Sequence, residues 1–178
     1  MRAGDVAAEM AVENCQPICA ASVADVGGMA QAQSMSSETE NPHSVHAWTL
    51  ATKAIDVDMA GDKAEACRLW QMSSDYADEH LTGETIYHWI KSGLGSALFE
   101  IGDYEGAISV SALALDGCSG MKQPLPALIM AKSYLKLGDR ESAARYVQRA
   151  YDLKGDAVLN LLDPADRGEM RSRLQRRG

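Results

Sequence analysis

Residues 102–107 read GDYEGA, and related phrases stand at 61–66 (GDKAEA) and 138–143 (GDRESA). Separations of 41 and 36 residues between the phrases are typical of helix-turn-helix repeats. In each phrase the Gly can adopt the left-handed conformation that ends a helix. The Asp that follows can cap the next helix, because its side chain accepts a hydrogen bond from a free backbone N–H. The phrases therefore predict three helix pairs, each with its Gly-Asp turn between the two helices.

Small residues recur at fixed distances from the three glycines. An Ala stands four residues after each Asp, at Ala66, Ala107 and Ala143. Other small residues stand seven positions before and twelve positions after each Gly: Ala54, Gly95 and Ala131, and Ser73, Ala114 and Ala150. Because the distance between packed helices depends on the side chains at their contact, this spacing predicts closely packed antiparallel pairs.

The pattern resembles the tetratricopeptide repeat over about residues 45–154. Repeat one departs from it where Lys53 takes a place that usually holds Leu. The matching positions are Leu94, Gly95, Gly102, Ala107 and Ala114 in repeat two, and Ala131, Tyr134, Gly138, Ala143 and Ala150 in repeat three. The resemblance implies an all-α fold, a right-handed α-solenoid of three tetratricopeptide-like helix pairs plus a C-terminal capping helix that covers the last repeat. We expect residues 1–43 to form an arm that is mobile or docked on a partner, and residues 44–178 to form the repeat domain.

The helix boundaries are expected at Gly, Pro and capping residues. The expected helices span about 44–59, 62–76, 85–100, 104–115, 126–137, 140–153 and 163–174, with a long turn at 77–84. Arg167, Arg171, Arg173, Arg176 and Arg177 are expected on the solvated face of the last helix.

The composition indicates which class of partner and which cellular compartment to expect. The net charge of −8 argues against nucleic acid as the main partner, because phosphate binding needs a basic face. No apolar run approaches the ~20 residues of a membrane helix, so we expect no membrane partner. The acidic start does not predict a secretory signal, so we expect a cytoplasmic location. The four cysteines are expected to be reduced, and Cys15 and Cys19 have no neighbouring ligands for zinc.

The sequence carries no pattern typical of catalysis. The four histidines have no carboxylate or Cys at metal-ligand spacing, and neither a Gly-rich phosphate loop nor a GxSxG nucleophile turn occurs. We therefore predict a binding protein rather than an enzyme, with no catalytic residues, no metal and no cofactor.

The tetratricopeptide resemblance also implies a peptide-binding groove lined by the first helix of each pair. The positions carried over are Trp48, Ala51, Ile55 and Met59 in repeat one, Trp89, Ser96 and Phe99 in repeat two, and Leu128, Lys132 and Leu135 in repeat three. Large aromatic side chains there favour an extended apolar peptide, which Lys132 and Lys136 would orient by pairing with acidic flanks. The alternative is that Trp48 and Trp89 pack internally or against the arm. A clamp for a terminal carboxylate is not expected, because Ala51, Ile55, Ser92 and Ser96 hold its places.

A closer resemblance is to the class II chaperones of type III secretion systems, which hold pore-forming translocators before export. It lies in residues 92–97 (SGLGSA), 102–108 (GDYEGAI), 124–127 (PLPA), 131–135 (AKSYL) and 138–139 (GD). It implies a cytosolic chaperone whose groove binds an extended segment of a secreted client. It also implies a possible homodimer through the arm and the first repeat, where Trp48 and Trp70 lack a preceding repeat to cover them. The alternative is a tetratricopeptide adaptor or immunity-type protein that binds a folded partner.

Overall fold

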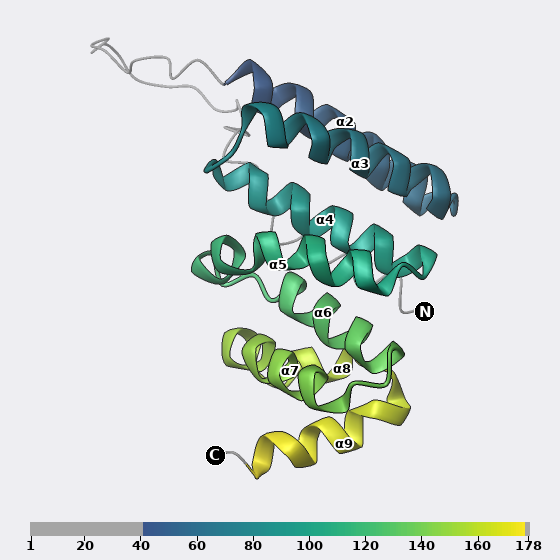
Figure 1. The fold of residues 1–178 in the computed structure, drawn as a ribbon, viewed down its shortest axis with the longest axis vertical. Helices are drawn as coiled ribbons and strands as arrows, with labels where there is room; N and C mark the ends of the chain where they lie inside the picture. Colours follow the sequence, from purple (N-terminus) through teal and green to yellow (C-terminus); the bar gives the residue numbers. More distant parts are fainter. Residues whose placement is uncertain (1–40, 177–178) are drawn as a thin grey trace, which may run out of the picture. The chain divides into compact units, whose positions relative to one another are not determined.

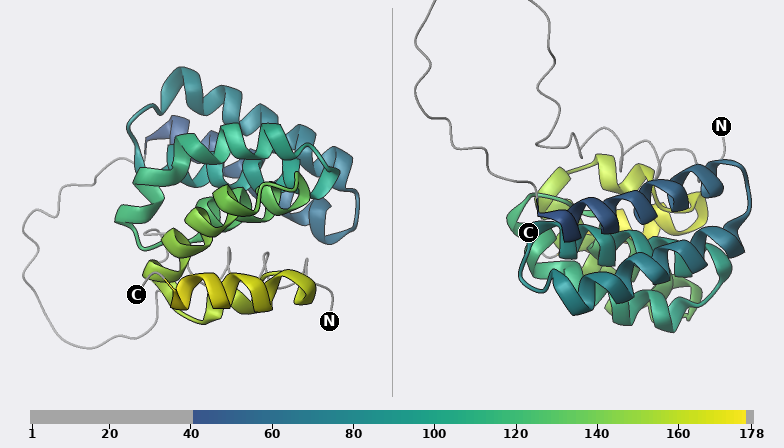
Figure 2. Two further views of the ribbon diagram at one scale, coloured as in Figure 1. Left: turned by 60° about the horizontal axis from the view of Figure 1, so that its bottom comes forward. Right: turned by 90° about the horizontal axis from the view of Figure 1, so that it is seen from above.

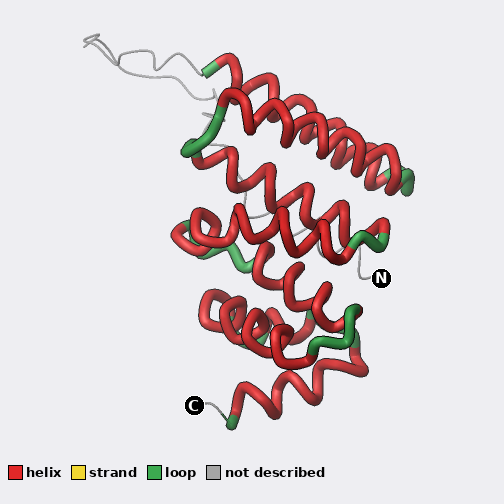
Figure 3. Tube along the Cα trace, in the orientation of Figure 1, coloured by secondary structure: helices red, strands yellow, loops and turns green. Residues whose placement is uncertain are grey.

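The computed structural model describes residues 41–176 of the 178-residue chain, and these residues are all-helical. Helices make up 83 % of this part, which contains no strand (Figure 3). The predicted all-α class is therefore confirmed for the described residues. The expectations for the arm, including Cys15 and Cys19, lie almost wholly outside them. No helix between residues 41 and 176 has both the length and the apolar character needed to cross a membrane.

Eight helices occupy the described part and succeed one another along its length (Figure 1). They are α2 (Pro42–Met59), α3 (Lys63–His80), α4 (Thr85–Ile101), α5 (Tyr104–Gly120), α6 (Leu125–Lys136), α7 (Arg140–Lys154), α8 (Ala157–Asn160) and α9 (Pro164–Gln175). Each of α2 to α8 packs on the next helix, and α4 also contacts both α2 and α6. Helix α9 packs on α7 and α8, and it lies in front in the left view of Figure 2.

The three Gly-Asp turns lie between helices, as predicted. Gly102 has a φ of 89° and ends α4, a conformation that an L side chain would strain. The side chain of Asp103 accepts a hydrogen bond from the Gly106 N–H at 2.9 Å. The turns at Gly61 and Gly138 repeat this geometry, with φ of 95° and 82°. A cap of this kind stabilises a helix by about 1 kcal/mol.

The recurring small residues lie where helices touch. Ala107 and Ala143 are fully buried, and so are the other predicted contact residues apart from glycine: Ala54, Ala66, Ser73, Ala114, Ala131 and Ala150. At Gly95 a Cβ would meet the Ser111 hydroxyl oxygen at 2.3 Å, so α4 and α5 approach there as closely as the spacing predicts. The pairing of these helices therefore depends on small side chains at the contact.

Two helices are longer than expected, and the long turn predicted at 77–84 is wrong. Helix α3 runs on to His80 and leaves only residues 81–84 between helices, because Ala77 and Leu81 are fully buried and hold this end against the core. Helix α5 continues to Gly120 because Cys118 is buried and Gly117 lies against the His88 ring.

The C-terminal part differs from expectation in one helix and one arginine. The short helix α8 precedes α9, and its Val158 and Leu159 are buried. Arg167 was expected in solvent, but its guanidinium donates hydrogen bonds to the carbonyls of Asn160 and Leu162 at 3.0 and 3.3 Å. It therefore joins the end of α8 to α9.

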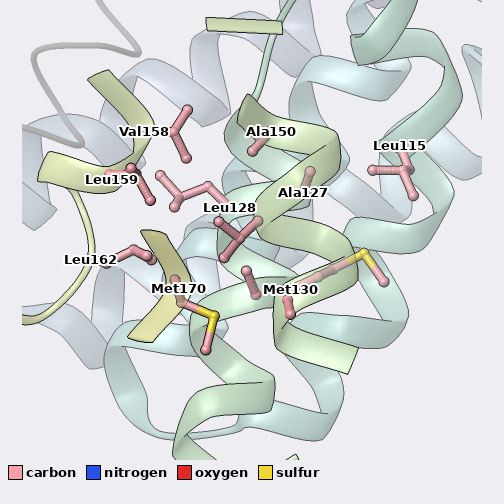
Figure 4. Packing of buried hydrophobic residues seen from close by; sticks show 12 residues of the cluster. Leu115, Ala127, Leu128, Met130, Ala150, Val158, Leu159, Leu162 and Met170 are labelled. Atoms are coloured by element: carbon pink, nitrogen blue, oxygen red, sulfur yellow. The ribbon is translucent and has the colours of Figure 1, made fainter. Parts of the chain in front are cut away.

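The largest hydrophobic cluster lies under α6 to α9. Leu128 and Met130 of α6 pack there with Val158, Leu159 and Leu162, and Met170 of α9 belongs to the same cluster (Figure 4). A second cluster joins α2, α3 and α4 around Trp70. Trp70 is only 7 % exposed although no repeat precedes it, because its ring lies against Gly93 of the following helix α4. The expectation that it stays exposed is therefore wrong.

Candidate functional site

The predicted binding residues all lie on α2, α4 and α6, the first helices of the three pairs. Helix α4 contacts both α2 and α6, so these residues come from neighbouring elements. We call this the A-helix face, defined by the half-buried or exposed members of the predicted set: Trp48, Ile55, Met59, Trp89, Ser96, Phe99, Lys132 and Leu135. Ala51 and Leu128 are buried in the hydrophobic clusters, so they lie under the face rather than on it.

At one end of the face two tryptophans meet across α2 and α4. The ring centroids of Trp48 and Trp89 are 4.7 Å apart, and Trp89 also lies 5.4 Å from Trp70. Trp48 and Trp89 are half-buried. The two tryptophans therefore pack against each other, as the alternative of internal packing predicts. Part of each residue nevertheless stays open to solvent.

At the other end a lysine and a phenylalanine meet across α4 and α6. The Lys132 ammonium lies 4.6 Å from the centroid of the Phe99 ring, and Phe99 also contacts Tyr104 at 5.5 Å. Burial lowers the pKa of Lys132, while the charges of Glu100 and Asp163 act in the opposite direction. This end of the face therefore combines an aromatic surface with a partly desolvated positive charge.

The remaining residues of the face differ in exposure. Met59 is 72 % exposed at the end of α2. Ile55 packs against the cluster of α2, α3 and α4, and Leu135 packs against the cluster under α6. The face is thus apolar over most of its length, with one cation near its third repeat.

Lys136, predicted to orient a bound peptide, is already paired. Its ammonium donates to Asp163 Oδ2 at 2.9 Å, which raises the pKa of Lys136 and lowers that of Asp163. The pair joins α6 to the residue that precedes α9. Lys136 therefore helps to attach the C-terminal helix, and its ammonium is less available to a peptide than the sequence prediction assumed.

One buried lysine, Lys91, was not predicted from the sequence. Lys91 on α4 is 3 % exposed, and its ammonium donates to Ser74 Oγ at 2.6 Å and to Asp78 Oδ2 at 2.7 Å. It also lies 5.2 Å from the centroid of the Tyr87 ring. Its place in the sequence, directly after the buried Ile90, was the one sign of its burial. This network ties α3 to α4.

Three histidines and a tyrosine gather where α2 meets the end of α3. His43 Nδ1 lies 2.7 Å from the Tyr76 hydroxyl, and its ring stacks on His80 with centroids 4.4 Å apart. His46 lies 4.5 Å from the Tyr76 ring. In residues 41–176 no three His, Cys, Asp or Glu side chains are placed to share a metal ion. The spacing of these histidines along the chain gave no sign of their contact.

Comparison of the chain with models of known protein families gives no match, and neither does comparison with curated protein sequences. What the chain binds is therefore inferred from the contacts of its own residues.

Proposed function

We propose that the chain is a right-handed solenoid of three tetratricopeptide-like helix pairs, capped by α9. Support comes from the three turns with the same left-handed Gly and the same Asp cap. Further support comes from the contacts of α4 with α2 and α6, because first helices of successive repeats lie side by side in such arrays.

We infer further that the A-helix face binds an extended apolar segment of a partner protein. The observation that carries this is the pair of contacts that join neighbouring first helices: Trp48 with Trp89, and Lys132 with Phe99. Aromatic rings that are held in place but partly open give large contact area at small entropic cost, so they are suited to anchor apolar side chains. On this basis the protein is a cytoplasmic chaperone that keeps a translocator-like client soluble before type III export, and not an enzyme.

The second candidate is an adaptor or immunity-type protein that uses the same face on a folded partner. Both candidates need the aromatic contacts, but they differ in the state of the partner. A client held as an extended segment stays sensitive to protease outside the bound stretch, whereas a folded partner is resistant throughout.

Co-expression with hydrophobic translocator proteins tests the proposal. The full chain should carry an otherwise aggregating client into the soluble fraction, and Phe99→Ala should weaken the complex by about 2 kcal/mol, roughly thirtyfold in Kd. Ile101→Ala is the matched control, because Ile101 is an exposed apolar residue of the same helix that is outside the predicted set. A client that remains insoluble, or a complex that Phe99→Ala leaves unchanged, contradicts the proposal. A protease-resistant partner selects the second candidate.

A further inference from the structure

Lys132 differs from Lys91 and Lys136 in its hydrogen bonds. Lys91 donates to a hydroxyl and a carboxylate, and Lys136 donates to a carboxylate. Lys132 is half-buried, yet within residues 41–176 its ammonium has the Phe99 ring as its neighbour and no hydrogen-bond acceptor. An ammonium that is partly removed from water without an acceptor is unfavourable for the folded chain.

The charged groups around Lys132 do not supply that acceptor. Asp163 already accepts from Lys136. Glu100, at the exposed end of α4, acts on Lys132 through its charge and not through a hydrogen bond. Lys136 adds positive charge nearby. The donors of Lys132 are therefore available to a ligand on the A-helix face.

We propose that Lys132 binds a side-chain carboxylate of the client, so that the recognised segment is apolar with one Asp or Glu placed beside the side chain that contacts Phe99. This inference rests on the proposed function and specifies its ligand. An aromatic face solvates the ammonium less well than water does, so a carboxylate that arrives there meets a cation with little hydration to lose. A Gln or Asn in the same place would leave the charge of Lys132 uncompensated, which makes the site selective for the acid.

Selection from a library of random twelve-residue peptides tests the inference without a known client. The peptides are joined to their carrier through their C-termini, so that every free peptide carboxylate is an acidic side chain. The full chain should enrich apolar peptides with Asp or Glu at a fixed distance from a large apolar residue. Peptides selected by Lys132→Gln should keep the apolar pattern and lose the acidic position. Peptides selected by Lys132→Arg should keep both features. Peptides selected by Lys132→Glu should carry Lys or Arg in place of the acid.

Lys136→Gln is the matched control, because Lys136 lies one turn away on the same helix but is paired with Asp163. Peptides selected by this variant should keep the acidic position. One selected peptide is then synthesised with an amidated C-terminus. Replacing its Glu by Gln should weaken its binding to the wild-type chain at least tenfold, but its binding to the Lys132→Gln variant less than twofold. Thermal melts of the variants confirm that they are folded.

The failures of the two proposals are distinct. Apolar peptides enriched without an acidic position, or an acidic position that survives Lys132→Gln, overturn the role of Lys132 and leave the binding face in place. A library from which the folded chain enriches nothing overturns the proposed function together with the inference.

Discussion

The ring of Trp70 on α3 lies directly against Gly93 on α4, so closely that a Cβ at residue 93 would come within 2.4 Å of the ring. Because Trp70 is buried and also contacts Trp89, its ring has little room to move. Gly93→Ala should therefore displace it and destabilise the fold by about 2 kcal/mol in spite of the better helix propensity of Ala. The melting temperature should fall by about 5–8 °C.

Gly168→Ala is the control for this change. Gly168 lies within α9, and a Cβ there would have no atom within 4 Å. The same substitution should therefore raise stability by about 0.5–1 kcal/mol through helix propensity alone. Equal effects of the two substitutions would contradict the close contact of Trp70 with Gly93.

The alanines that follow the capping aspartates give a second prediction. Ala107 and Ala143 are fully buried where helices meet. Ala107→Leu or Ala143→Leu should overpack the contact and cost about 1–3 kcal/mol, measured by thermal or urea unfolding. Ala112→Leu on the exposed side of α5 should change stability by less than about 0.5 kcal/mol. An unchanged melt for both buried variants would be incompatible with this packing.

The sequence predicted the helix pairs because their turns depend on local chemistry. The Gly with positive φ and the Asp cap interact only with residues a few positions away. Small residues at a fixed spacing likewise indicate directly where two helices are in close contact. The ends of α3 and α5 were harder to predict because they depend on distant partners: Leu81 is held by the core and Gly117 by His88. Propensity alone gives no information on such contacts.

The candidate site was predicted less completely than the fold. The repeat pattern placed the right helices side by side, but it could not separate Ala51 and Leu128, which are buried, from neighbours that remain accessible. It also could not assign the lysines. Lys91, Lys132 and Lys136 look alike in the sequence, and their roles depend on whether Asp78 or Asp163, residues far along the chain, reach them.

The buried pair of Lys91 and Asp78 gives a third prediction. Asp78→Ala removes one of the two acceptors of a side chain that is only 4 % exposed, so the ammonium keeps a single acceptor, the Ser74 hydroxyl. We expect a loss of about 2–3 kcal/mol, because hydrogen bonds to buried charges are among the stronger ones. Asp75→Ala, at an exposed position on the same helix, should cost less than about 0.5 kcal/mol. Similar urea midpoints for the two variants would show that the pairing of Lys91 with the Asp78 carboxylate does not stabilise the fold.

Lys132 and Lys136 should respond in opposite directions to replacement by Met. Burial lowers the pKa of Lys132 below its usual value of 10.5, so the folded chain holds this proton less tightly than the unfolded chain does. The charged form therefore destabilises the fold at neutral pH, and Lys132→Met should raise the melting temperature while it weakens the binding of acidic peptides. The hydrogen bond to Asp163 raises the pKa of Lys136, so its charge contributes stability below pH 10.5. Lys136→Met should lower stability by about 0.2–1 kcal/mol, as expected for an exposed pair.

The pH dependence separates this explanation from a simple gain of apolar contact. Between the lowered pKa of Lys132 and 10.5 the unfolded chain binds more protons than the folded one, so the stability of the wild-type chain relative to Lys132→Met should improve as the pH rises through this window. The advantage of Lys132→Met should then shrink on approach to pH 10, in melts recorded from pH 7 upward against Lys136→Met. An advantage of Lys132→Met that stays constant with pH would assign the effect to packing of the new Met. If Lys132→Met instead melts below the wild-type chain at pH 7, the contact of Lys132 with Phe99 stabilises the fold more than burial of the charge destabilises it.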